Sequence, residues 1–126
     1  MGKKYSFNIN KLLELQRKFV KDRDWDVFHT PKNLSMALAG EAGELVEIFQ
    51  WLTPEESFEV MKTASKSLQI KHELADILYY TLRIADRLNV DLEKALIEKL
   101  KQNAKRYPVK LSKGNAKKYT ELKMKD

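Results

Sequence analysis

The sequence predicts an all-α fold, a helical bundle of four main helices plus a short helix, in a single domain over residues 1–126. Two stretches, residues 34–51 and 70–88, place apolar residues three and four apart, as one face of a helix requires. Helix start and stop signals recur along the chain, and no stretch alternates as a strand would. Because these helices carry more apolar surface than one chain comfortably covers, we expect oligomerisation to complete the bundle.

The first helix is expected from about residue 8 to residue 21, where Leu12 and Phe19 contribute to an amphipathic stripe. The loop that follows, DRDWDVFHTPKNL, carries Trp25 and His29. An aromatic loop of this kind either covers the core as a lid or stacks on a flat ligand, to which each ring contributes ~1–3 kcal/mol per base. Both uses stay open from the residues alone.

The second helix is expected to begin near Pro31 and to run through Gln50 or Trp51. On a helical wheel Glu41 falls inside the apolar stripe, and Glu44 lies one turn further, at its edge. A carboxylate inside an apolar stripe is unfavourable unless a counter-charge meets it. This helix therefore carries a candidate site.

Thr53 and Pro54 form a start signal for a short helix that would extend to about Ser65. Residues 65–67 would then lead into another long helix, which ends near Asn89. Glu73 lies within the apolar arc of that helix and Asp76 flanks it. The sequence thus places a carboxylate pair on each of two apolar helix faces.

Asp91 is expected to cap the last helix, residues 92–106, and Pro108 to prevent its continuation. Residues 107–126 are interpreted as an irregular arm that packs through its tyrosines. Three polar side chains lie on the apolar face of the last helix, the cations Lys99 and Arg106 and the amide Asn103. Such cations either bind phosphate oxygens or simply snorkel to solvent.

Four carboxylates on two helices, Glu41, Glu44, Glu73 and Asp76, predict a metal site. Residues three apart are neighbours on a helix, so each pair can present two carboxylate groups to the same ion. Hard oxygen donors in a chain without cysteine favour Mg²⁺, with Mn²⁺ as the alternative, over zinc.

The net charge of +6 is concentrated at one end, because residues 101–126 hold nine basic and two acidic side chains. This distribution argues against a stable nucleic-acid complex of the whole domain, although a basic tail can contact polyanions. The chain has no apolar run of the roughly 20 residues that a membrane span needs, no signal-peptide-like start and no cysteine. We therefore expect a cytoplasmic location and no membrane partner.

The spacing Glu41-x-x-Glu44 followed by Glu73-x-x-Asp76 resembles the metal motif of the MazG-like superfamily of all-α nucleoside triphosphate pyrophosphohydrolases. Four sequence segments are similar to the dCTP pyrophosphatase branch of this superfamily, and they are RDWDVFHTPKNL, GEAGELVEIFQW, ELADILYYTLRIAD and KQNAKRYPVKLSKGNAKKYTEL. This resemblance covers the chain from about residue 12 to residue 122.

The resemblance implies Mg²⁺-dependent hydrolysis of a nucleoside triphosphate, dCTP or a 5-modified dCTP, to the monophosphate and pyrophosphate, by a homotetramer that sanitises the nucleotide pool. It also implies that the four carboxylates are the metal ligands and that Gln16 stands where vertebrate relatives carry His. The substrate-binding residues that it implies are Trp25, His29, Trp51, Tyr80, Lys99, Asn103 and Arg106. From the chemistry of a metal-activated water, we expect Glu44, with Glu47 as the alternative, to be the carboxylate that takes its proton. A pyrophosphatase for another nucleotide such as dUTP, and a helical nucleic-acid-binding module without enzymatic activity, are the alternatives.

Overall fold

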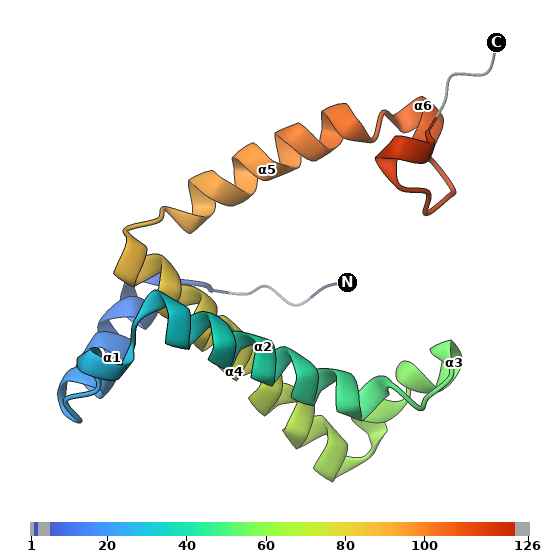
Figure 1. Cartoon of the computed structure of the whole chain (residues 1–126). Helices are drawn as coiled ribbons and strands as arrows, with labels where there is room; N and C mark the ends of the chain where they lie inside the picture. Colours follow the sequence, from blue (N-terminus) through green and yellow to red (C-terminus); the bar gives the residue numbers. More distant parts are fainter. Residues whose placement is uncertain (1, 3–5, 123–126) are drawn as a thin grey trace. The chain divides into compact units, whose positions relative to one another are not determined.

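The computed structural model describes residue 2 and residues 6–122, and the chain divides into two compact units, Met1–Asn89 and Val90–Asp126 (Figure 1). Throughout the described residues, every regular element is helical, which confirms the predicted all-α class. None of these described helices is both long enough and apolar enough to cross a membrane. The single-domain assignment over residues 1–126 stays a prediction, and residues 123–126 of the predicted arm lie outside the described residues.

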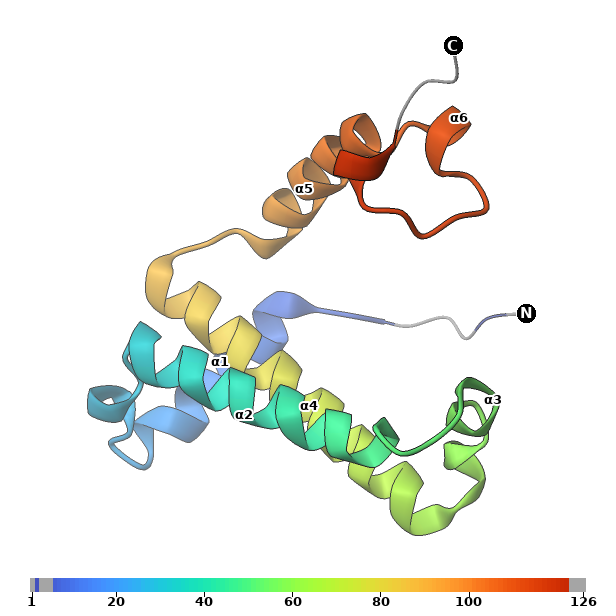
Figure 2. The ribbon, with the colours of Figure 1, turned by 45° about the vertical axis from the view of Figure 1, so that its right-hand side comes forward.

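The first unit is built around two long helices, α2 (Pro31–Phe49) and α4 (Ala64–Leu88). They pack side by side and run in opposite directions in both ribbon views (Figures 1 and 2). The helix α1 (Ile9–Lys21) packs against α4, and the one-turn 3₁₀ helix η1 (Asp26–Phe28) connects α1 to α2. This arrangement brings side chains of α2 against side chains of α4 along much of their length.

Local signals explain where these helices begin and end. The side chain of Asn8 accepts a hydrogen bond from the backbone N–H of Lys11, and Thr30 accepts one from that of Asn33, so each caps the helix that follows. Asn89, with φ of 53°, adopts the left-handed conformation that commonly ends a helix. The predicted bounds of α1 and α2 and the predicted end of α4 are therefore confirmed to within a residue or two.

The short helix is the part of the fold that the sequence predicted least well. Thr53 and Glu56 form the expected capping box, but α3 (Pro54–Ser57) has only four residues and does not reach Ser65. The 3₁₀ helix η2 (Val60–Lys62) follows it, and the side chain of Val60 is buried. Burial of Val60 turns the chain back towards α4, which begins at Ala64, so the predicted linker at residues 65–67 belongs to its first turn.

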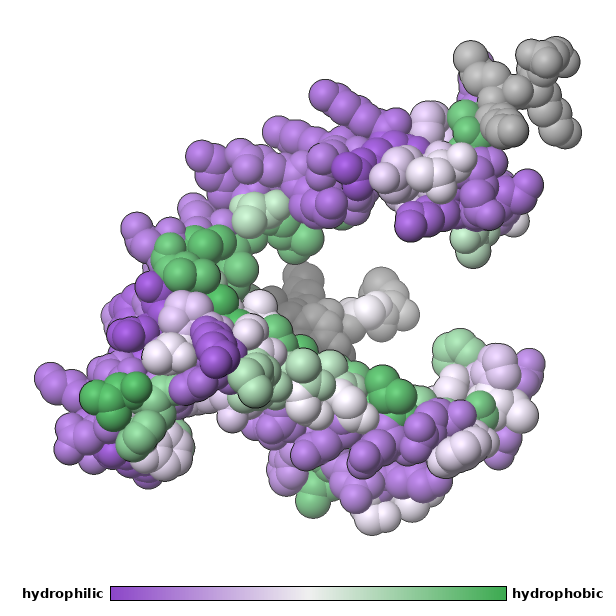
Figure 3. Space-filling view, in the orientation of Figure 1, coloured by the Kyte–Doolittle hydropathy of each residue, from purple (hydrophilic) through white to green (hydrophobic). Residues whose placement is uncertain are grey.

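The core of the first unit is small. Val20 and Leu34 are fully buried, and the other buried hydrophobic side chains are Val60, Ile70, Leu82 and Ala85. Large hydrophobic side chains stay exposed on α1, α2 and α4, as Leu15, Met36 and Leu74 illustrate, and Figure 3 shows such residues at the surface among hydrophilic ones. The predicted completion of the bundle by further copies remains a prediction.

The second unit consists of α5 (Leu92–Arg106), α6 (Val109–Ser112) and the 3₁₀ helix η3 (Tyr119–Glu121). Asp91 caps α5 as predicted, through a 3.0 Å hydrogen bond from the N–H of Lys94. The arm is not wholly irregular, because the carbonyl of Pro108 accepts bonds that start α6. Tyr107 and Tyr119 pack edge to face, with ring centroids 6.1 Å apart.

Candidate functional site

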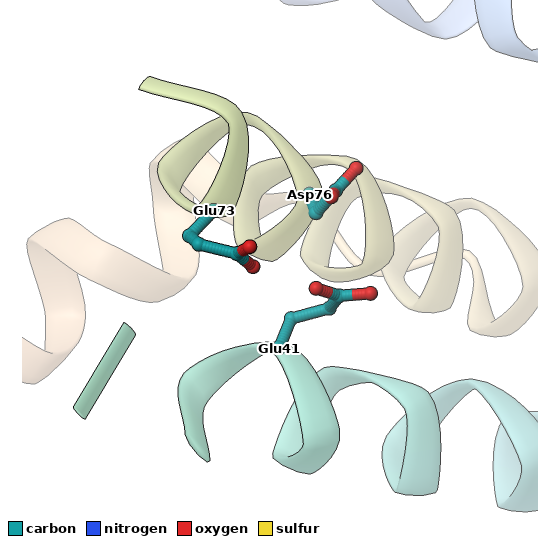
Figure 4. Close-up of side chains that lie close together, drawn as sticks. All are labelled: Glu41, Glu73 and Asp76. Carbon is teal, nitrogen blue, oxygen red and sulfur yellow. The ribbon is translucent and has the colours of Figure 1, made fainter. Parts of the chain in front are cut away.

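Three of the four predicted carboxylates converge between α2 and α4. Glu41 comes from α2, whereas Glu73 and Asp76 come from α4, and one oxygen of each lies within 4.8 Å of the others. Figure 4 shows the Glu41 and Glu73 side chains pointing toward one another across the gap between the two helices. The antiparallel packing of two apolar faces therefore gathers acidic groups that are 32 to 35 residues apart in the chain.

These carboxylates lack the partners that buried charges normally have. One oxygen of Glu41 and one of Glu73, both Oε2, are buried without a hydrogen-bond partner among the described residues. Burial, followed by the nearby carboxyl groups of Glu73, Glu44 and Asp76, raises the pKa of Glu41 to about 7. Several hard oxygen donors with unpaired buried atoms form a set that could hold a divalent cation.

Glu44 is not part of this close group of three. It is exposed on α2, one turn after Glu41, and its negative charge contributes to the raised pKa of Glu41. Glu47 is also exposed on α2. The structure thus separates the close group of Glu41, Glu73 and Asp76 from Glu44 and Glu47, which the sequence grouped with it or considered as bases.

A cavity of about 580 Å³ adjoins the carboxylates. Asp76 belongs to its lining as well as to the acidic group, so the cavity opens onto the carboxylate site. The walls come from α1, from the aromatic loop and from α4. They include the predicted substrate-binding residues Trp25, His29 and Tyr80, together with Gln16.

Aromatic rings form much of the cavity wall. Phe19 packs edge to face against Trp25 at 5.7 Å between centroids and against Tyr79 at 6.5 Å. Burial and the charges of Glu41 and Asp76 raise the pKa of Tyr80, so its hydroxyl stays protonated beside the acidic group. A flat, partly polar ligand fits these surroundings.

Gln16 is buried, and its side-chain amide donates a 3.3 Å hydrogen bond to the carbonyl of Tyr79. The interaction fixes the amide against α4 at the edge of the cavity. Gln16 therefore contributes to the wall on which the aromatic residues sit.

The structure does not bring the two tryptophans together within the first unit. Trp51 follows the last residue of α2, is 87% exposed and is absent from the cavity lining. Trp25 and His29 precede the first residue of α2, a helix of 19 residues and hence about 28 Å long. In one copy of the chain the two indole rings are thus at opposite ends of this helix.

Lys99, Asn103 and Arg106 lie on α5 in the second unit. The Lys99 ammonium donates a 3.1 Å hydrogen bond to Gln102, and the Arg106 guanidinium stacks over Tyr119 at 4.8 Å. Their function at a phosphate chain stays a prediction.

A buried arginine is the main feature of this region that sequence analysis missed. Arg83 is only 3% exposed, and it pairs with Asp26 in η1 and with Asp86 one turn further along α4. Its Nε–H also donates a 3.1 Å hydrogen bond to Nδ1 of His29. The i, i+3 spacing of Arg83 and Asp86 was a visible signal, but the partners in the loop are more than 50 residues away.

A model of the MazG-like family matches residues 37–122, well over half of the chain. The chain belongs to the MazG-like family. The resemblance in the carboxylate motif and the surrounding words is thereby confirmed. The matched region of this MazG-like chain contains all four predicted metal ligands, whereas Trp25 and His29 precede it.

Relatives of this MazG-like chain include dCTP pyrophosphatase 1 of Bos taurus, which is 43% identical over 122 residues, 94% of this chain and 72% of the relative. The dCTP pyrophosphatase 1 of Homo sapiens is 40% identical over 123 residues, again 94% of this chain and 72% of the relative. Among solved structures, a pyrophosphatase from Archaeoglobus fulgidus DSM 4304 has a TM-score of 0.75 and 33% sequence identity. That similarity covers 86% of this chain and 99% of the archaeal one.

Proposed function

We propose that this chain is a nucleoside triphosphate pyrophosphohydrolase that converts dCTP to dCMP and pyrophosphate, with Mg²⁺ as its cofactor and Mn²⁺ as the alternative ion. The observation that carries the proposal is the group of Glu41, Glu73 and Asp76 beside an aromatic cavity, in which two buried oxygens find no hydrogen-bond partner within the described part of the chain. Relatives named dCTP pyrophosphatase 1 at 40–43% identity support the substrate. Removal of dCTP from the cytoplasmic nucleotide pool is the corresponding cellular role.

Glu41, Glu44, Glu73 and Asp76 would hold the metal ion, which neutralises phosphate charge and lowers the pKa of a bound water. Glu41 and Glu73 each supply a buried oxygen that has no hydrogen-bond partner among the described residues, and Asp76 supplies a third oxygen close to both. Glu44 adds an exposed carboxylate at the solvent side of the group. Because the neighbouring carboxyl groups repel one another, as the raised pKa of Glu41 reflects, the free energy of metal binding would include relief of this repulsion.

Glu44 is also the best candidate for the base, with Glu47 as the alternative. A base must lie within reach of the attacking water, and Glu44 is an exposed carboxylate one helical turn from Glu41. The water oxygen forms a bond to phosphorus as its proton passes to the carboxylate, and the bond to the leaving phosphate oxygen breaks. Phosphoryl transfer of this kind depends mainly on positioning and charge stabilisation.

The cavity is proposed to bind the base of the nucleotide. Trp25 and His29 line it on the loop side, and Tyr80 lies next to Glu41 and Asp76, where the sugar would pass. Trp51 is too far from Trp25 within one chain, so we infer that the Trp51 that closes this cavity belongs to a second copy. A homotetramer, which would also cover the exposed hydrophobic side chains, supplies that second copy.

Lys99, Asn103 and Arg106 are proposed to bind the phosphates and the adjoining sugar. Lys offers a point charge, and Arg offers a planar fork that matches phosphate oxygens. Together with the metal they would replace a glycine-rich phosphate loop, which the sequence lacks.

The proposal is tested by measuring pyrophosphate release from the common dNTPs and NTPs, first with Mg²⁺ and then with EDTA. We expect turnover led by dCTP or a 5-substituted dCTP, complete loss in EDTA, and loss in Glu73→Gln. Glu55→Gln is the matched control, because it removes an exposed carboxylate on α3 outside the site. Preference for another nucleotide such as dUTP would be consistent with the proposed hydrolysis but would refute the assignment of cytosine as the preferred nucleobase.

Absence of turnover with every nucleotide would refute the enzyme proposal and favour the nucleic-acid-binding alternative. That alternative predicts binding that weakens steeply with salt and needs no metal. We expect no stable nucleic-acid complex, because the basic residues are concentrated at the C-terminal end.

Replacing Trp51 with Ala should raise KM for dCTP about tenfold and lower kcat much less, because stacking on the base is the same in the ground and transition states. Its 87% exposure in one chain means that the variant should fold normally. Steady-state kinetics with a thermal melt provide the measurement. An unchanged KM would exclude Trp51 from the base pocket.

A further inference from the structure

His29 has one ring nitrogen that is fully committed within the protein. The Nε–H of Arg83 donates to Nδ1 of His29 over 3.1 Å. An imidazole nitrogen that accepts a hydrogen bond uses its lone pair and cannot carry a proton at the same time. The ring proton of neutral His29 must therefore be on Nε2.

Arg83 is held firmly enough to enforce this choice. It is 3% exposed, its Nη1 lies 3.2 Å from a carboxylate oxygen of Asp86, and its Nη2 donates to Asp26. Arg17 in turn binds Asp86 through a 2.9 Å hydrogen bond. An arginine has only donors, so rotation of its group could not offer Nδ1 an acceptor instead.

His29 also lines the cavity, so Nε2–H is the ring group left to meet a ligand. We propose that Arg83 is a positioning residue that locks His29 as a neutral Nε2–H donor, so that the cavity selects a base edge that carries acceptors. This inference rests on the proposed function and concerns the selectivity of the same site. It assigns a function to a buried charge that the proposed mechanism does not use.

The lock has a direct chemical consequence for pyrimidines. In cytosine O2 and N3 are both acceptors, whereas in uracil and thymine N3 carries a hydrogen. A free histidine can exchange tautomers and accept from that hydrogen, whereas the locked ring, placed opposite N3, would meet it with a second donor. Leaving a buried donor unpaired is costly, and sites built around such a bond discriminate strongly against the mismatched ligand.

The charged surroundings of His29 favour its neutral form. Burial lowers its pKa first, Arg83 and Arg87 lower it further, and the carboxylate of Asp26 opposes them. A neutral ring at physiological pH is the state that the hydrogen bond from Arg83 requires.

Arg83 also attaches the aromatic loop to α4 through Asp26, and this purely structural function must be separated from the lock. Arg83→Lys retains the positive charge for Asp26 and Asp86 but places a methylene where Nε–H is. Asp26→Asn weakens the loop attachment and leaves the Nε–H of Arg83 opposite His29. The two variants therefore affect different interactions of one residue.

The first measurement is the tautomeric state of His29 by ¹H–¹⁵N correlation spectroscopy of the full-length protein at pH 7.5. Only two histidines are present, so His72→Gln, at an exposed position, assigns the spectrum. We expect Nε2–H alone in the wild type and in Asp26→Asn, and both tautomers in Arg83→Lys. A protonated Nδ1 in the wild type would overturn the proposal, whether or not any nucleotide is hydrolysed.

The second measurement is the ratio of kcat/KM for dCTP to that for dUTP with Mg²⁺. We expect Arg83→Lys to lower this ratio about tenfold and Asp26→Asn to leave it unchanged. An unchanged ratio in Arg83→Lys, or an equal loss in both variants, would overturn the assigned selectivity. If the wild type turns over no nucleotide, the proposed function fails while the spectrum still decides the lock.

Discussion

Two groups of charged side chains are built around residues of α4 within the first unit, and they differ in whether their charges are paired. Arg83 is buried, yet Asp26, Asp86 and His29 all bind it. Glu41 and Glu73 each have a buried oxygen without any partner among the described residues. A paired buried charge holds the structure together, whereas an unpaired one stores unfavourable free energy that a ligand can relieve.

The largest expected effect follows from removing the paired charge. Arg83→Met should lower the free energy of unfolding by about 2–4 kcal/mol, because it leaves Asp26 and Asp86 without their buried partner. Urea denaturation at a fixed protomer concentration measures this loss. A loss below about 1 kcal/mol would show that the network is dispensable for stability.

The carboxylate group of Glu41, Glu73 and Asp76 should instead stabilise the folded protein when a metal ion binds to it. Mg²⁺ at roughly 100 times its Kd should stabilise the folded protein by about 2.7 kcal/mol, because it binds only the folded state. Thermal melts with Mg²⁺ and with EDTA measure the shift, which Glu73→Gln should abolish and Glu55→Gln should retain. Equal shifts in the wild type and Glu73→Gln would place the ion elsewhere.

Neutralising one unpaired carboxylate should stabilise the metal-free protein. Because the pKa of Glu41 is about 7 when folded and 4.5 when unfolded, the folded state holds the extra proton between these values. The stability that protonated Glu41 contributes is therefore fully present below pH 4.5 and is lost as the pH rises from there through 7. Glu41→Gln should avoid that loss and be more stable above pH 7 by about 1 kcal/mol, a value reduced by solvent screening.

Melts in EDTA from pH 5 to pH 8.5 measure this difference. The gap between Glu41→Gln and the wild type should widen from pH 5 to about pH 7 and stay constant at higher pH. A gap that is constant over the whole pH range would mean that the Glu41 carboxylate is not responsible for it.

The smallest effect is expected at the outer edge of the arginine network. Arg17 binds Asp86 as Arg83 does, but its side chain is 53% exposed. Exposed ion pairs contribute little, so Arg17→Met should change the urea midpoint by a small fraction of the change in Arg83→Met. Similar losses in the two variants would show that burial does not decide the strength of these pairs.

The sequence by itself determined the helices and the position of each carboxylate on them. The caps at Asn8, Thr30 and Asp91 involve residues three apart, and so does the pairing of Glu73 with Asp76. Signals of this range are readable because one helical turn sets the geometry. The end of the short helix could not be read in this way, since burial of Val60 in the tertiary structure decides it.

Only the tertiary structure decided which side chains meet across elements. It brought Glu41 to Glu73 and Asp76, left Glu44 outside the close group, and put Trp51 at the far end of α2 from Trp25. It also joined Arg83 to His29 and Asp26, 54 and 57 residues away. Such partners depend on how helices pack and on where a loop folds back, and no spacing along one helix contains that information.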